Sequence, residues 1–121
     1  MSVYVDTLIH HDPSRMDAAT RRAGAPHGHR WCHLFCDPGE EEKLHGLAAA
    51  IGMKRAWFQA PPKASHPHYD LPPPRRAAAL KTGAIELDRA GLRAFFDRWR
   101  AHRGQPSIGD IVASTRKAGG L

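Results

Sequence analysis

The sequence predicts a single α/β domain: a small, mainly parallel four-stranded sheet with three or four helices. Its 121 residues are the length of one domain. A hydrophobic fraction of 41% and a charged fraction of 25% are typical of a globular chain. Short runs with strand character alternate with amphipathic stretches, and strands joined by helical crossovers pair in parallel. We expect the domain to cover residues 1–103, followed by an extension over residues 104–121.

The first half of the chain is expected to supply two strands, a long loop and a helix. Residues 2–6 (SVYVD) alternate and are rich in β-branched and aromatic side chains, which predicts a strand. Residues 7–30 contain Pro, Gly, His and Arg without a sustained period, which predicts a long loop. Residues 31–36 (WCHLFC) predict the second strand, and residues 40–51 predict a helix. The apolar stripe of this helix consists of Leu44, Leu47, Ala48 and Ile51.

The second half is expected to alternate strands with helices. The predicted strands are residues 56–59 (AWFQ) and 84–87 (AIEL). The predicted helices are residues 72–82, 89–102 and, in the extension, 108–117. A loop rich in Pro and His joins the third strand to its helix over residues 60–69. The buried stripe of the 89–102 helix is expected to be Leu92, Phe95, Phe96 and Trp99.

Positive charge is concentrated in the second half of the chain. Eighteen basic residues exceed twelve acidic residues, for a net charge of +6. Residues 1–60 carry seven of each sign, whereas residues 61–121 carry eleven basic and five acidic residues. Such a one-sided distribution favours an anionic partner, either nucleic acid or a small phosphate-bearing molecule. The alternative is a solvated helix surface with no partner.

Several classes of protein are disfavoured. No apolar run approaches the roughly 18 residues that cross a membrane, and the start MSVYVDTLIHHD lacks the charge and apolar pattern of a signal peptide. Cys32 and Cys36 would lie roughly 13 Å apart along a strand, too far for a disulfide, so we expect small core residues. A cytoplasmic location follows as an expectation. The sequence contains no Walker A, GxGxxG, GxSxG or HExxH pattern.

Four blocks of sequence occur in the order typical of one family. They are VYVDT, WCHLFCD, KLHGLAAAIGMKRAWFQ, and HPHYDL followed by RRAAALKTGAIEL, between Val3 and Asp88. In these blocks the chain resembles DUF4031, an uncharacterised family of small phage and bacterial proteins. The resemblance implies a domain boundary and carries no activity with it. The first strand, ending in Val-Asp-Thr, is also similar to the start of PIN-type nucleases.

The predicted topology gathers polar residues at one edge of the sheet. Carboxyl ends of parallel strands line the edge where open α/β folds bind ligands. The polar residues at these ends and in the adjoining loop are Asp6, Asp37, Gln59, His66, His68, Asp70 and Asp88. Carboxylates and imidazoles together suit a divalent metal: Mg²⁺, Mn²⁺ or, if the histidines dominate, Zn²⁺. The predicted ligands are Asp6, Asp37, His66, His68 and Asp70.

Each of these residues also has a structural interpretation. Asp37, Asp70 and Asp88 precede predicted helices, where Asp is a favoured N-cap. His33 is either a buried, hydrogen-bonded side chain or a general base. The alternate spacing His66-x-His68-x-Asp70 suits a chelating edge, although loops carry polar residues regardless of function. Asp6 has no helix after it, which favours a role in the site.

Basic and aromatic residues near this edge are the candidates for ligand binding. Arg75, Arg76 and Lys81 on the 72–82 helix are expected to bind phosphate, together with Gln59 at the edge. Of Trp57 and Phe58, one is expected to pack inward and the other to be free to stack on a base. The arginines of the last long helix are expected to form its exposed face; these are Arg89, Arg93, Arg98, Arg100 and Arg103.

These observations predict a divalent-metal protein that binds or hydrolyses a phosphate-containing ligand, either a nucleotide or a nucleic-acid phosphodiester. Asp6 and His33 are the expected catalytic residues, with His33 as base or water-orienting group. The alternative is a non-enzymatic module, of the phage or mobile-element type, that binds nucleic acid or protein through its basic half. Metal binding that is lost in Asp6→Ala would favour the first, and metal-independent, salt-sensitive binding of nucleic acid the second.

Overall fold

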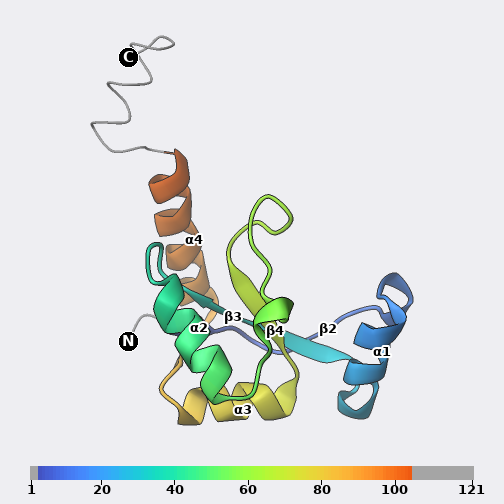
Figure 1. Cartoon of the computed structure of the whole chain (residues 1–121). Helices are drawn as coiled ribbons and strands as arrows, with labels where there is room; N and C mark the ends of the chain where they lie inside the picture. The colour runs from blue at the N-terminus through green and yellow to red at the C-terminus, as the bar shows by residue number, and fades with distance from the viewer. Residues whose placement is uncertain (1–2, 105–121) are drawn as a thin grey trace.

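Helices cover both faces of a five-stranded sheet in the computed structural model, which describes residues 3–104 (Figure 1). The strands are β1 (Val3–Val5), β2 (Ile9–His10), β3 (Arg30–Cys36), β4 (His68–Leu71) and β5 (Ile85–Glu86). The helices are α1 (Ala18–Gly24), α2 (Glu41–Ala50), α3 (Pro73–Lys81) and α4 (Arg89–Gly104). The predicted single α/β domain is confirmed, and the predicted 108–117 helix lies outside the described residues.

The prediction of a mainly parallel sheet is wrong. Strand β3 is central and pairs antiparallel with β1, β2 and β4, whereas only β1 and β5 pair in parallel. Helix α2 lies between β3 and β4 and was expected to mark a parallel crossover. The connection does not end with α2, because a long segment follows the helix before β4 begins at His68. With this added length the chain enters β4 in the direction opposite to β3.

The strand predicted over residues 56–59 does not form. Arg55–Trp57 forms a 3-10 turn, and Gln59 makes only an isolated bridge to His68. A strand forms instead at β4, whose first two residues lie in the segment 60–69 that was expected to be a loop. Its four residues alternate between faces, so Tyr69 and Leu71 are buried in the apolar core while the side chains before and after Tyr69 face the opposite way.

The segment 7–30 is structured rather than a continuous loop. It contains β2, α1 and two 3-10 turns, at Pro13–Arg15 and Ala25–His27. The carboxylate of Asp17 accepts the Thr20 N–H at 2.7 Å and so caps α1. Val5 pairs with Leu34, and Ile9 pairs with Trp31. Three residues therefore separate the two pairs on the side of β1 and β2, but only two separate them on β3. This bulge begins at Asp6.

One face of the sheet is apolar and is covered by α2 and α3. The buried strand residues on it are Val3, Val5, Cys32, Leu34, Cys36, Tyr69 and Leu71. The predicted stripe of α2 packs here, and all four of its residues are buried. Burial raises the pKa of Cys32 and of Cys36 to about 12, and both cysteines are free, as expected of small core residues.

The other face is covered by α4 over only part of its area. Phe95 and Trp99 of α4 pack on Phe35, and Leu92 and Phe96 are partly buried beside them, which confirms the predicted stripe. Figure 1 shows α4 and the segment before β4 on this side of the sheet and α3 on the other. Among residues 3–104, no helix combines the length and apolarity needed to cross a membrane.

Candidate metal centre

Three neighbouring strands place a row of polar side chains on the partly covered face. His33 of β3 pairs with Asp70 of β4, and the backbone N–H of Asp6 donates to the His33 carbonyl at 3.4 Å. Asp6, His33 and Asp70 therefore form one row across the sheet. His68 lies two residues before Asp70 in β4, so its side chain is on the same face.

The carboxylate of Asp6 determines the orientation and tautomer of His33. Asp6 Oδ1 accepts the His33 backbone N–H at 2.6 Å, and Asp6 Oδ2 lies 2.7 Å from His33 Nδ1. Because an ionised carboxylate only accepts hydrogen bonds, Nδ1 carries the proton. The hydrogen bond with Asp6 raises the pKa of His33 despite partial burial, and His33 Nε2 remains 3.7 Å from Asp70 Oδ1.

The backbone carbonyl of His66 determines the orientation and tautomer of His68. Its Nδ1 lies 2.9 Å from the His66 carbonyl oxygen, which can only accept, so Nδ1 is again the protonated nitrogen. His68 Nε2 lies 3.4 Å from Asp70 Oδ1. The ring is buried, with 9% of the side chain exposed, so this orientation is also held by packing.

Asp70 presents one oxygen to both histidines and has the other occupied. The amide of Gln59 donates to Asp70 Oδ2 at 2.5 Å, which leaves Oδ1 facing the two imidazole nitrogens. Burial raises the pKa of Asp70, but its contacts with His68, Gln59 and His33 outweigh burial, and the pKa lies below its ordinary value. The carboxylate is therefore ionised at neutral pH.

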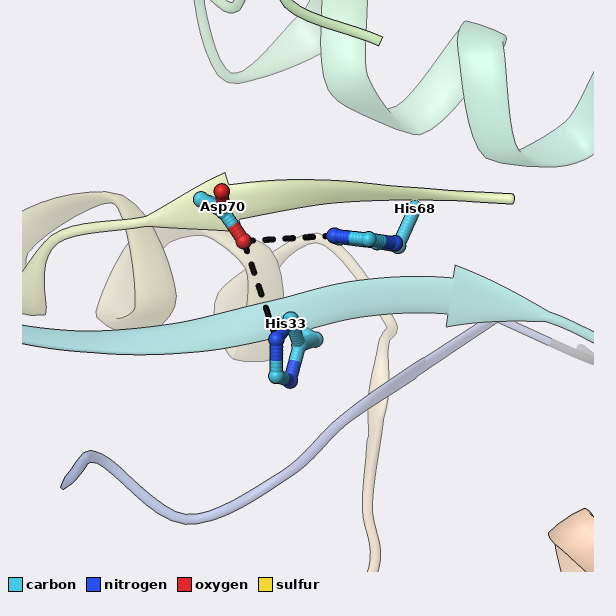
Figure 2. Close-up of side chains that lie close together, drawn as sticks. All are labelled: His33, His68 and Asp70. Atoms are coloured by element: carbon cyan, nitrogen blue, oxygen red, sulfur yellow. Dashed lines mark ion pairs between the residues drawn. The ribbon is translucent and has the colours of Figure 1, made fainter. Parts of the chain in front are cut away.

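His33, His68 and Asp70 together resemble a metal-ligand set (Figure 2). Their three free ligand atoms lie within 4.8 Å of one another. Ligands bound to Zn²⁺ at about 2.0–2.1 Å in a tetrahedron are roughly 3.3 Å apart, close to the two separations measured from Asp70 Oδ1.

His66, a predicted ligand, lies beside this set but outside it. Its ring centroid is 4.9 Å from that of His68, and its Nδ1 lies 2.9 Å from Ser65 Oγ. Phe35, Phe95 and Phe96 surround the ring. Burial, with the charges of His68 and His33, lowers the pKa of His66 to about 4, so the ring is neutral at pH 7. Its Nε2 is buried without a hydrogen-bond partner among the described residues.

The predicted single edge that collects all the acids does not form. Because β1 and β3 are antiparallel, Asp6 and Asp37 follow opposite ends of the sheet. Asp37 accepts a hydrogen bond from Tyr4 Oη at 2.6 Å and pairs with Arg98 at 3.1 Å. Asp88 caps α4 through the Gly91 N–H at 2.7 Å, as its capping interpretation predicts, whereas Asp70 lies within β4 and caps no helix.

The three cations predicted to bind phosphate are placed elsewhere. Arg75 donates to the Ile51 carbonyl at 3.0 Å. Arg76 donates to the Asp6 carbonyl at 2.9 Å and pairs with Glu86 at 2.6 Å, so it supports the backbone behind the candidate metal centre. Lys81 is exposed at the end of α3, the helix on the opposite face of the sheet.

The sequence named every member of this centre but not how they are connected. Gln59 was expected to contact a ligand, whereas it orients Asp70. Asp6 was expected to hold the ion, whereas both its oxygens contact His33. The alternation of His68 and Asp70 was the available signal for a strand that could pair with His33. Phe58 packs on Tyr69 and Trp57 is 45% exposed, as the prediction of one inward and one outward aromatic requires.

Comparison with known proteins identifies the family of the chain. The family model described as "Protein of unknown function (DUF4031)" matches residues 16–99, more than half of the chain. No curated protein and no solved structure matches the chain significantly.

Proposed function

The chain belongs to the DUF4031 family, and we propose that it binds one divalent metal ion through His33 Nε2, His68 Nε2 and Asp70 Oδ1 and hydrolyses a phosphate ester there. One observation carries the proposal. Three electron-rich ligand atoms face one another within 4.8 Å, while the second polar atom of each side chain already has a partner.

The local charge balance favours a cation at this point. With Nδ1 protonated on both rings, each Nε2 presents a lone pair to the ionised Asp70 carboxylate. Such an arrangement is repulsive unless a proton or a metal ion lies between the groups. A divalent ion satisfies all three atoms at once, whereas protons satisfy both contacts only when the two neighbouring imidazoles are charged together.

The second layer of contacts also favours a metal. Histidine ligands in metal sites commonly donate their other N–H to a carboxylate or a backbone carbonyl. His33 does the first through Asp6 and His68 does the second through the His66 carbonyl. Two imidazoles and one carboxylate favour Zn²⁺, Mn²⁺ or Fe²⁺ over Mg²⁺, which prefers oxygen ligands.

The chemistry follows from the number of protein ligands. Three ligands leave positions for water and for a substrate, as in catalytic rather than structural sites. A metal in such a site lowers the pKa of its water and polarises a phosphoryl oxygen. His33 is partly exposed, so the centre is accessible from the uncovered side of the sheet. The net charge of +6 supports an anionic phosphate-containing substrate.

Metal binding by the purified chain, freed of metal by a chelator and then dialysed, tests the first part. We expect one Zn²⁺ or Mn²⁺ per chain in native mass spectrometry and titration calorimetry, and loss of binding in His33→Ala, His68→Ala and Asp70→Asn. His45→Ala is the control, because His45 contacts Tyr69 and Phe58 on the opposite face. Absence of stoichiometric metal, or equal loss in the control, contradicts the proposal.

Hydrolysis of bis(p-nitrophenyl) phosphate by the metal-loaded chain tests the second part. We expect turnover that a chelator abolishes and that Asp70→Asn lacks. A chain that binds metal but hydrolyses neither this ester nor a nucleotide or oligonucleotide is not a phosphate-ester hydrolase. Exposed arginines on α4 favour a second candidate, a non-catalytic nucleic-acid-binding module, which predicts binding of nucleic acid that persists in the chelator.

A further inference from the structure

We infer that the outer side of α4 binds the phosphodiester backbone of a nucleic-acid strand and holds it beside the metal centre. This inference rests on the proposed function and deepens it, since it makes the substrate a polymer rather than a free nucleotide.

Three arginines of α4 lie along one line of the helix. Arg89, Arg93 and Arg100 are spaced by four and seven residues, which places them within about 40° of one another at 100° per residue. All three are exposed. They span about 16 Å at 1.5 Å per residue. Arg98 projects from the opposite side of the helix, where it pairs with Asp37.

The arginine line borders the flank of α4 that faces the metal centre. Phe96 and Leu92 lie between this line and the buried stripe. The Phe96 ring packs 5.1 Å from His66, whose ring is 4.9 Å from the ligand His68. Leu92 and Arg89 also line a depression of about 320 Å³ together with Asp6, the residue that orients His33.

Two of the three charges of this line have no ion pair among the described residues. Among the described residues neither Arg89 nor Arg93 has an ion pair, and Arg100 pairs with Asp97 on the same exposed surface. Arg75 and Arg76, by contrast, donate to backbone carbonyls. Guanidinium groups remain charged at any physiological pH and suit phosphate geometry.

The length of the line selects the class of ligand. A nucleoside monophosphate carries its charge on a single phosphate. When that phosphate is at the metal, no other phosphate is left to contact the line of arginines. A strand repeats its charge at regular intervals, so neighbouring phosphates can follow the helix while one of them lies at the metal. The arrangement therefore fits a continuous phosphodiester backbone and requires no base-specific contact.

Salt-dependent binding of labelled 20-nucleotide strands by the metal-loaded chain tests the inference. The variant Arg89→Gln/Arg93→Gln/Arg100→Gln is compared with Arg15→Gln/Arg22→Gln/Lys81→Gln, which removes the same charge from exposed positions outside α4. Each phosphate contact with a single strand contributes about 0.7 to the slope of log K against log salt. We expect the α4 variant to lose about 2 units of slope, the control to lose none, and both to retain one metal ion.

Other outcomes overturn the inference. Equal loss of slope in the two triple variants, or displacement of the strand by polyglutamate as readily as by DNA, indicates a diffuse basic surface. A metal-loaded chain that binds no strand removes α4 as a nucleic-acid surface and leaves the metal centre intact. Strand binding that depends on the α4 arginines in a wild-type chain that takes up no metal contradicts the proposed function instead. DNA and RNA strands and a DNA duplex of one sequence, run in parallel, identify the preferred polymer.

Discussion

In each proposed ligand residue, the second polar atom of the side chain has a hydrogen-bond partner, and this contact leaves the first atom available to a metal. Asp6 holds His33 Nδ1, the His66 carbonyl holds His68 Nδ1, and Gln59 holds Asp70 Oδ2. These contacts set tautomer and orientation before any ion arrives. Mutation of an orienting residue should therefore affect metal binding even though the residue does not touch the metal.

Asp6→Asn should weaken metal binding by about 10- to 100-fold. The asparagine oxygen can still accept the His33 backbone N–H, but its amide then donates to His33 Nδ1 and moves the ring proton to Nε2. Titration calorimetry measures the change. Asp37→Asn is the matched control, because Asp37 contacts Tyr4 and Arg98 instead, and it should bind metal with unchanged affinity. Equal losses in the two variants would contradict the assignment of Asp6.

His45 should make stability depend on pH. Burial lowers its pKa below the ordinary value near 6.5, and its Nδ1 lies 2.7 Å from Tyr69 Oη. The unfolded chain therefore binds more protons than the folded chain as pH falls through 6.5, so the contribution of His45 is present above that pH and lost below it. In chelator, wild type should exceed His45→Gln in unfolding free energy by more at pH 7.5 than at pH 5. An equal difference at both pH values argues against a lowered pKa.

At the scale of elements, α4 connects the apolar core with the proposed metal centre. Phe95 is fully buried against Phe35 and Tyr4, and Phe96, one residue later, packs on His66. Trp99 Nε1 donates to the Ser65 carbonyl at 3.2 Å and so ties α4 to the segment before β4. The helix that stabilises this face thus also positions the chain that leads into His66 and His68.

Phe95→Ala should lower the free energy of unfolding by about 3–5 kcal/mol, the usual loss for a fully buried aromatic. Since domains of this size have about 5–15 kcal/mol in total, the variant should be close to unfolding. Chemical denaturation of the metal-free chain measures the loss. Phe96→Ala should cost less, because Phe96 is only partly buried. The reverse order of the two losses would show that α4 is rotated about its axis relative to the sheet.

At the scale of the whole molecule, the two faces of the sheet differ in the side chains that they carry. The face under α2 and α3 is continuous apolar core, and the face under α4 is apolar only around Phe35. The remaining part carries the row Asp6, His33 and Asp70, contributed by the bulge after β1, by β3 and by β4. A metal bound there would join β3 and β4 and, through Asp6, the end of β1.

Metal should therefore stabilise the whole domain. At a free concentration 100 times the Kd, binding to the folded state alone adds about 2.7 kcal/mol. For a domain of about 100 residues this raises Tm by roughly 10 °C or more. Scanning calorimetry with Zn²⁺ and with chelator measures the difference. Asp70→Asn should abolish it, and a Tm shift of equal size in that variant would place the metal elsewhere.

Local sequence is sufficient to predict the elements whose residues bury one consistent face. The stripes of α2 and α4 and the strand character around residues 3–5 and 31–36 follow from local periodicity, because the same side chains must meet the core in any arrangement of the sheet. The residue types of the proposed centre also follow from the sequence, because the spacing of His68 and Asp70 and the position of His33 in a strand mark them as site candidates.

Which of these residues come into contact depends on long-range strand pairing. Strand direction depends on where residues 37–67 lead the chain, and short polar strands such as β4 are stabilised by their partner rather than by their own pattern. The β3–β4 pairing set His33 opposite Asp70, and the antiparallel β1–β3 pairing separated Asp37 from Asp6. The residue type determines which ligands a side chain can bind. The antiparallel register, which depends on residues far apart in the sequence, determines which other side chains lie close to it.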